Sequence, residues 1–210
     1  MLLYAFEYSE ALTAFKEIVT VDPQCCMGYF FAAATYTTPI WAFISDSKLA
    51  STHSFSLNAT TCANSNAALS PREAAYISAL SVYATLDDLP PSQRLAQYAD
   101  ALQTQVYEPY INTDENAGII YGLSLLAVGY YDNDEPKNGY PNLQKAGKLE
   151  QDVVARNPRS PGALHYVIHA YDQPALASRA LLAAEAFARV ADGVPHQIHM
   201  PSHIYSDLGM

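Results

Sequence analysis

The chain has 210 residues, of which 50% are hydrophobic and 15% are charged. This length can bury a substantial core in one or two packed units. The net charge of −10 argues against a nucleic-acid partner, because phosphate binding needs clustered Lys and Arg. No apolar run approaches the ~20 residues of a membrane span. The opening MLLYAFEYSE lacks the basic and then apolar pattern of a secretory signal.

Apolar residues recur with helical spacing along most of the chain, and alternation typical of strands is nearly absent. We therefore predict an all-α fold of about nine to eleven helices. Asp22-Pro23 and Asn157-Pro158 follow two of the expected helices, so Pro23 and Pro158 should lie in turns. Helices are expected near residues 7–21, 26–36, 49–69, 71–84, 92–107, 114–131, 142–156, 162–171 and 176–190, with a last one starting near 199.

Two local signals refine this pattern. Ser70-Pro71-Arg72-Glu73 is a capping box with proline at the first helical position, which should open a helix. Pro201 cannot lie deep inside a helix, so we expect the last helix to begin within about one turn before it.

The three cysteines offer neither a disulfide framework nor a CxxC metal site. Cys25, Cys26 and Cys62 are therefore interpreted as small buried hydrophobic residues of helices. Asn58-Ala59-Thr60 is a glycosylation sequon that matters only in a secreted chain. Few lysines and many Tyr, Ser, Asn and Thr residues favour an extracytoplasmic or secreted protein, although the compartment stays open.

Four histidines form two pairs with the same internal spacing. His165 and His169 are four residues apart, as are His199 and His203, and 34 residues separate the two pairs. This is the period of a tetratricopeptide (TPR) repeat, a helix–turn–helix unit. Because residues four apart share a helix face and residues one period apart occupy matching positions, we expect a histidine quartet on one surface.

Such a quartet is a candidate site for a divalent transition metal. Imidazole suits zinc, copper, nickel or iron, and copper or zinc is the expected ion. The predicted metal ligands are His165, His169, His199 and His203. His196 lies one turn before the last pair, where it can join the quartet, and we place it with Tyr166, Tyr171 and Tyr205 among residues that contact a ligand in the groove.

The stretch 157–208 resembles a family of uncharacterised TPR-domain proteins with NP-x-HPGA-x-H-x-x-IHAYD and H-x-x-HMPSHI motifs. These motifs read NPRSPGALHYVIHAYD and HQIHMPSHI here, with Ser160 in place of a histidine. EALTAFKEIVTVDPQCCMGYF, SPREAAYI and IIYGLSLLAVG also resemble the family. The resemblance implies TPR-like repeats stacked in a right-handed superhelix (an α-solenoid), with residues 1–210 as one repeat domain. Both ends fall inside expected repeats, which suggests a piece of a longer array.

Three hypotheses for function remain open. The first is a TPR-type scaffold whose concave groove binds a peptide or protein through tyrosines and histidines. The second is a metalloprotein or metal-dependent redox enzyme at the histidine quartet. The third is a subunit that self-associates through uncapped ends. No catalytic residue is predicted, because Tyr166 occupies the position where an HExxH hydrolase needs Glu, and GxSxG and phosphate-binding glycine motifs are absent.

Overall fold

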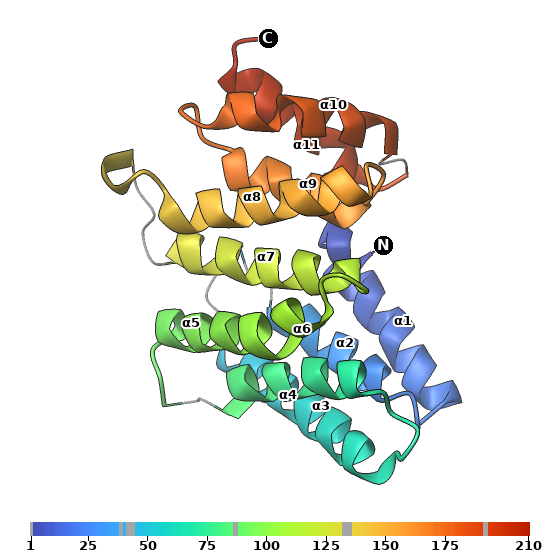
Figure 1. Cartoon of the computed structure of the whole chain (residues 1–210). Coiled ribbons are helices and arrows are strands. Elements are labelled where there is room, and N and C mark those ends of the chain that lie inside the picture. Colours follow the sequence, from blue (N-terminus) through green and yellow to red (C-terminus); the bar gives the residue numbers. More distant parts are fainter. Residues whose placement is uncertain (1, 38–39, 41–44, 86–87, 132–135, 191–192) are drawn as a thin grey trace. The chain divides into compact units, whose positions relative to one another are not determined.

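The computed structural model describes residues 2–37, 40, 45–85, 88–131, 136–190 and 193–210 (Figure 1). Within these ranges every regular element is helical and no strand occurs, which confirms the predicted all-α fold. None of the described helices is long and apolar enough to cross a membrane. The chain divides into two compact units, called here the disulfide unit (Glu7–Thr113) and the histidine unit (Leu3–Phe6 with Asp114–Met210).

The disulfide unit is a succession of helices, each packed against the next. Its elements are α1 (Tyr8–Val21), α2 (Cys26–Thr37), α3 (Asp46–Ser65), α4 (Pro71–Thr85), α5 (Pro91–Leu102), a π-helical segment η2 (Gln103–Tyr107) and α6 (Glu108–Tyr110). Pro23 lies in the turn between α1 and α2, as predicted.

The start of α4 confirms the predicted capping box. The Ser70 amide donates to Oε2 of Glu73 at 3.0 Å, and the Glu73 amide donates to Oγ of Ser70 at 3.3 Å. The same hydroxyl donates to the carboxylate at 2.7 Å, and these bonds from Ser70 lower the pKa of Glu73. Two backbone donors at the helix start are thereby satisfied.

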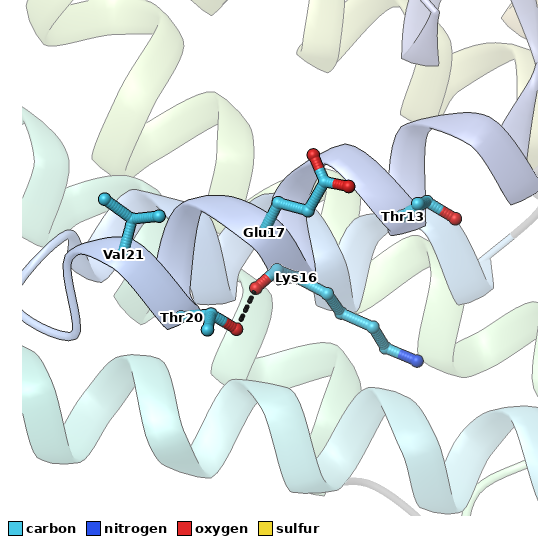
Figure 2. A pocket seen from close by; sticks show the side chains of 5 residues that line it. All are labelled: Thr13, Lys16, Glu17, Thr20 and Val21. Carbon is cyan, nitrogen blue, oxygen red and sulfur yellow. Dashed lines mark hydrogen bonds between the residues drawn. The ribbon is translucent and has the colours of Figure 1, made fainter.

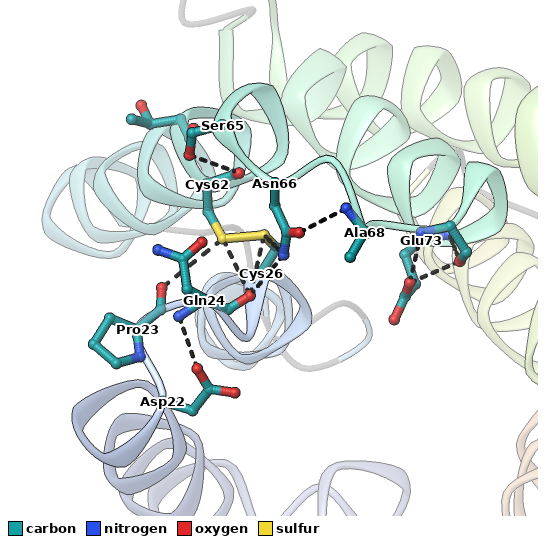
Figure 3. The surroundings of a disulfide bond; sticks show 11 residues. Asp22, Pro23, Gln24, Cys26, Cys62, Ser65, Asn66, Ala68 and Glu73 are labelled. Atoms are coloured by element: carbon teal, nitrogen blue, oxygen red, sulfur yellow. Dashed lines mark hydrogen bonds between the residues drawn. A yellow bond between two sulfur atoms is a disulfide. The ribbon is translucent and has the colours of Figure 1, made fainter.

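The cysteine prediction is wrong. Cys26 and Cys62 are buried in helices but are bonded to each other, and Cys25 is half-buried and lies just before α2. Cys26 on α2 and Cys62 on α3 form a disulfide, and Cys25 remains a free thiol (Figure 3). The bond is possible because α2 and α3 pack side by side, which brings two residues 36 positions apart within reach of each other. The Asn66 side-chain amide donates to the Gln24 carbonyl at 3.1 Å beside this bond.

The histidine unit contains η1 (Leu3–Ala5), α7 (Glu115–Tyr131), η3 (Pro136–Asn138), α8 (Pro141–Arg156), α9 (Pro161–Tyr171), η4 (Ala177–Ala180), α10 (Leu181–Val190) and α11 (Pro195–Asp207). The central helix is α9, which contacts α7, α8, α10, α11 and η1. All of its residues from Gly162 to Tyr171 are buried. Pro158 lies in the turn between α8 and α9, as predicted.

The expectation for Pro201 is wrong. It lies inside α11, which begins at Pro195 and therefore more than one turn earlier. A proline within a helix removes one backbone hydrogen bond, here the bond to the Gln197 carbonyl, and the helix continues through this gap. His199 and His203 consequently lie on one regular helix, with the i, i+4 relation that their spacing requires.

Candidate metal centre

Three histidines of the histidine unit converge at the contact between α9 and α11. His165 and His169 are one turn apart on α9, and His196 lies in the first turn of α11. Nε2 of His165 lies 3.1 Å from Nε2 of His196 and 3.0 Å from Nε2 of His169. The candidate ligand atoms of all three lie within 4.8 Å of one another.

These separations suit a shared metal ion. Zinc–imidazole bonds of ~2.0–2.1 Å in a tetrahedral site place two nitrogen ligands roughly 3.3 Å apart. The two Nε2 separations that involve His165, 3.0 and 3.1 Å, require only a few tenths of an ångström of expansion. The bound for the candidate ligand atoms of the whole set is 4.8 Å, so an ion shared by all three would also draw His169 and His196 toward each other. Three imidazoles with a fourth position left for water or another ligand form a set known from zinc proteins.

The backbone near the N-terminus orients the central imidazole. Nδ1 of His165 lies 2.6 Å from the carbonyl oxygen of Tyr4. Because a carbonyl oxygen can only accept, Nδ1 carries the proton and donates it. In the neutral ring Nε2 therefore keeps its lone pair and faces His169 and His196. A backbone carbonyl that fixes the tautomer in this way is characteristic of metal-ligating histidines.

Aromatic rings enclose the three imidazoles. The Phe6 ring lies 4.8 Å from the ring of His165, 5.4 Å from that of His169 and 5.5 Å from that of His196, measured between centroids. Phe187 of α10 stacks on His165 at 5.5 Å. The surroundings are thus apolar, and water is largely excluded from the two α9 imidazoles.

Burial keeps these imidazoles neutral. It lowers the pKa of His165 to about 3 and that of His196 to about 4, and it holds the pKa of His169 well below the ordinary value. Positive charge on neighbouring histidines lowers the pKa of each further. A neutral imidazole is the form that binds a metal, so the unprotonated ligand set is already present at neutral pH.

The other two predicted ligands lie farther along α11. The His199 ring is 4.8 Å from the His196 ring, and the His203 ring is 5.3 Å from that of His199. His199 is exposed, and Nδ1 of His203 lies 2.9 Å from Oδ2 of Asp172. The convergent set in the described residues therefore combines His165 and His169 with His196, whereas His199 and His203 form a continuation of it toward solvent.

The three tyrosines predicted to contact a ligand in the groove differ in how deeply they are buried. Tyr166 is 0% exposed and Tyr171 is 2% exposed, so both lie in the interior of the histidine unit. Tyr205 on α11 is half-buried. Only Tyr205 and His196 of the predicted ligand-contacting set reach solvent in this structure.

Three contributors to the site were missed by sequence reasoning. Tyr4 and Phe6 belong to no motif and are more than 150 residues away from His165 in sequence. Asp172 lies three residues after His169 in the IHAYD segment, and that proximity was the one available signal.

The disulfide unit has a surface pocket on α1. It is lined by side chains of that one helix, Thr13, Lys16, Glu17, Thr20 and Val21 (Figure 2). All five are exposed, and the Thr20 hydroxyl is bonded to the Lys16 carbonyl of the same helix at 2.7 Å. The pocket is a shallow hollow on one helix face and holds no convergent set of buried polar groups.

Comparison of the chain with models of protein families, with curated proteins and with solved structures finds no match. The resemblance to TPR-domain proteins therefore stays a prediction.

Proposed function

We propose that this protein binds a divalent transition metal ion, zinc or copper, through His165, His169 and His196. The observation that carries the proposal is that Nε2 of His165 lies 3.0 Å from Nε2 of His169 and 3.1 Å from Nε2 of His196, with the candidate ligand atoms of all three within 4.8 Å of one another. Imidazole ligands without thiolate favour zinc, copper or nickel over the hard cations magnesium and calcium. The ion would be held by two residues of the central helix and one of the last helix.

Energetics also supports a bound ion. Burying polar imidazoles among apolar rings costs free energy unless their nitrogens are satisfied. In the described residues, His165 and His169 direct their Nε2 atoms at other imidazoles of the cluster, an arrangement that a metal ion would satisfy better than a proton shared between rings.

The test is metal-dependent thermal unfolding of untagged, metal-stripped protein. Zinc or copper bound only to the folded state should raise the Tm with increasing concentration. His196→Ala, which removes a half-buried ligand without emptying the core, should eliminate this rise. His53→Ala is the matched control, because His53 is an exposed histidine on α3 of the other unit. A parent protein whose Tm responds to no divalent transition metal would refute the proposal.

A second candidate is a TPR-type scaffold that binds a peptide or protein. Its support is the packing pattern, in which consecutive helices within each unit contact each other, and within the histidine unit α7 also contacts α9, as α9 contacts α11. Contacts to first and second neighbours are typical of stacked helix–turn–helix repeats. A right-handed superhelix with a concave groove is part of this proposal. The test is pull-down or peptide-array binding by the parent, with loss of binding in a Tyr205→Ala variant.

The disulfide supports an oxidising compartment for this protein. Disulfides persist in secreted and extracytoplasmic proteins and are rare in reducing compartments. We infer that the chain folds outside the cytoplasm, in agreement with its low lysine content. Trapping of free thiols in cells, followed by mass spectrometry of the peptide pair that contains Cys26 and Cys62, tests this inference.

A further inference from the structure

Helix α11 carries a line of imidazoles that leads from the buried centre to solvent. His196, His199 and His203 are spaced by three and four residues, so they share one face of the helix. Successive ring centroids are 4.8 and 5.3 Å apart, and the His196 ring is 5.0 Å from that of His165. Exposure increases from 0% for His165 to half-buried His196 and exposed His199, and His203 at the far end is half-buried.

His203 lies at the outer end of this line, and a carboxylate orients its imidazole. Nδ1 of His203 lies 2.9 Å from Oδ2 of Asp172, whose carboxylate accepts the Nδ1 proton when the imidazole is neutral. The lone pair of His203 is then on Nε2, as in the carboxylate–histidine pairs of metal sites. The side chains of His203 and Asp172 are 37% and 23% exposed, so a hydrated ion can reach them from solvent.

Negative charge gathers at the same end. Asp207 follows His203 by one turn on α11. Burial raises the pKa of the Asp172 carboxyl, and the nearby Asp207 raises it further. Two carboxyl groups beside two accessible imidazoles attract a divalent cation. His199 adds the second imidazole, with Nδ1 in a long 3.4 Å contact to the Pro195 carbonyl.

We propose that His199, His203 and Asp172 form a surface loading site that captures the metal ion and passes it through His196 to the buried centre. This inference rests on the proposed metal-binding function. At each step the ion forms one new bond to an imidazole. In exchange it loses one bond, either to a water molecule or to an imidazole that it bound earlier. The ion remains a dication throughout. Adjacent rings about 5 Å apart are close enough for both to hold the ion during the exchange.

The need for such a route follows from the burial of the final ligands. His165 and His169 are 0% and 4% exposed, and Phe6 and Phe187 pack on His165. A hydrated dication that lost its water shell before meeting them would incur a large desolvation cost. Replacing water by imidazole one ligand at a time avoids a bare ion in apolar surroundings.

A relay and a permanent ligand set differ in kinetics. A residue that only transfers the ion speeds loading and release equally, so its removal leaves the equilibrium affinity unchanged. A permanent ligand stabilises the bound state, so its removal raises the Kd. The experiment is stopped-flow uptake of Zn²⁺ by metal-stripped protein and release to a chromogenic chelator, with the Kd from equilibrium competition.

The variants are the double change His199→Ala with His203→Ala, the single change Asp172→Asn, and His196→Ala as the ligand control. For the double variant we expect loading and release both slowed by about tenfold and a Kd within about twofold of the parent. Asp172→Asn should slow both rates less. His196→Ala should raise the Kd strongly. The replaced side chains of the double variant are solvent-accessible, and circular dichroism checks that its helices are intact.

Two results for the double variant would overturn the relay alone. One is loading and release at the rates of the parent, and the other is a raised Kd with an unchanged loading rate. The second would make His199 and His203 permanent ligands. A parent that takes up no Zn²⁺ would overturn the metal centre itself, and the relay with it. His53→Ala should match the parent in every measurement.

Discussion

Phe6 contacts three histidines from a backbone conformation that bulky residues rarely adopt. Its φ is +61°, in the left-handed region, and its ring packs on His165, His169 and His196 and stacks on Tyr166 at 5.5 Å. A non-glycine residue in this region costs about 1–2 kcal/mol. The ring contacts offset that cost, and the unfavourable backbone is retained where it encloses the candidate metal centre.

This backbone conformation predicts that Phe6→Ala destabilises the protein more than Phe6→Gly, the reverse of the usual order. Phe6→Ala should destabilise the protein by about 3 kcal/mol, because it removes a buried ring but keeps the backbone strain. Phe6→Gly should be less destabilising by roughly 1 kcal/mol, because glycine adopts positive φ without the steric cost. Chemical denaturation of both variants tests the order. An alanine variant more stable than the glycine variant would contradict the strain argument.

The histidine pKa values predict how stability depends on pH without metal. The folded-state pKa is about 3 for His165 and about 4 for His196, whereas the unfolded value is ~6.5. Below pH ~6.5 the unfolded chain binds more protons than the folded chain, so the free energy of unfolding falls as the pH falls from there toward 4. The loss continues until the folded-state pKa values are reached.

Thermal unfolding of metal-stripped protein between pH 7.5 and about 4.5 measures this slope. His196→Ala should reduce it, since one group with a lowered pKa is gone. His53→Ala should leave it close to the parental slope. A Tm that rises as the pH is lowered through this range would show that the imidazoles are not held neutral in the folded state.

At the scale of elements, the close approach of α7 and α8 depends on a glycine. A Cβ at Gly122 would lie 2.0 Å from Oε1 of Glu150, whose side chain is 0% exposed. Neither carboxyl oxygen of Glu150 has a hydrogen-bond partner among the described residues, and burial raises its pKa well above the usual range. The carboxyl group is therefore expected to be protonated in the folded protein.

A double-mutant cycle tests this contact. Gly→Ala in an ordinary helix stabilises by about 1 kcal/mol. Gly122→Ala should instead destabilise the parent by about 1–3 kcal/mol, because the new methyl group displaces the buried carboxyl. In a Glu150→Ala background the same change should cost little, which gives a coupling energy of about 0.5–3 kcal/mol. Additive free energies of unfolding would show that the two residues do not interact.

At the scale of the whole molecule, the two compact units differ in the features that lie at their helix contacts. The disulfide unit has a covalent link between α2 and α3, and the histidine unit has the imidazole cluster around α9. A link between residues 36 positions apart removes conformational freedom mainly from the unfolded chain.

Replacing both Cys26 and Cys62 by Ala should lower the free energy of unfolding of the disulfide unit by about 3–4 kcal/mol, from the loop-entropy relation. The zinc-dependent rise in Tm assigned to the histidine unit should persist in this variant. Cys25→Ala is the control and should have little effect. Thermal unfolding with and without a reducing agent checks the result, and an unchanged Tm after reduction of the parent would refute it.

The sequence alone was sufficient wherever the deciding interactions are local. The capping box at Ser70, the turns at Pro23 and Pro158, and the shared face of His165 and His169 depend on residues within about one turn of each other. The all-α class follows from the same short-range periodicity. These features were predicted because the backbone geometry of a helix fixes which neighbours in sequence can meet.

Only the tertiary structure decided which residues meet across helices. The repeat spacing paired His165 and His169 with His199 and His203, yet α11 presents its first turn to α9, so His196 completes the convergent set. Packed helices cross at an angle and contact closely over a limited stretch, which a repeat period does not specify. The Tyr4 carbonyl and the Cys26–Cys62 bond depend likewise on chain segments that are distant in sequence and adjacent only after packing.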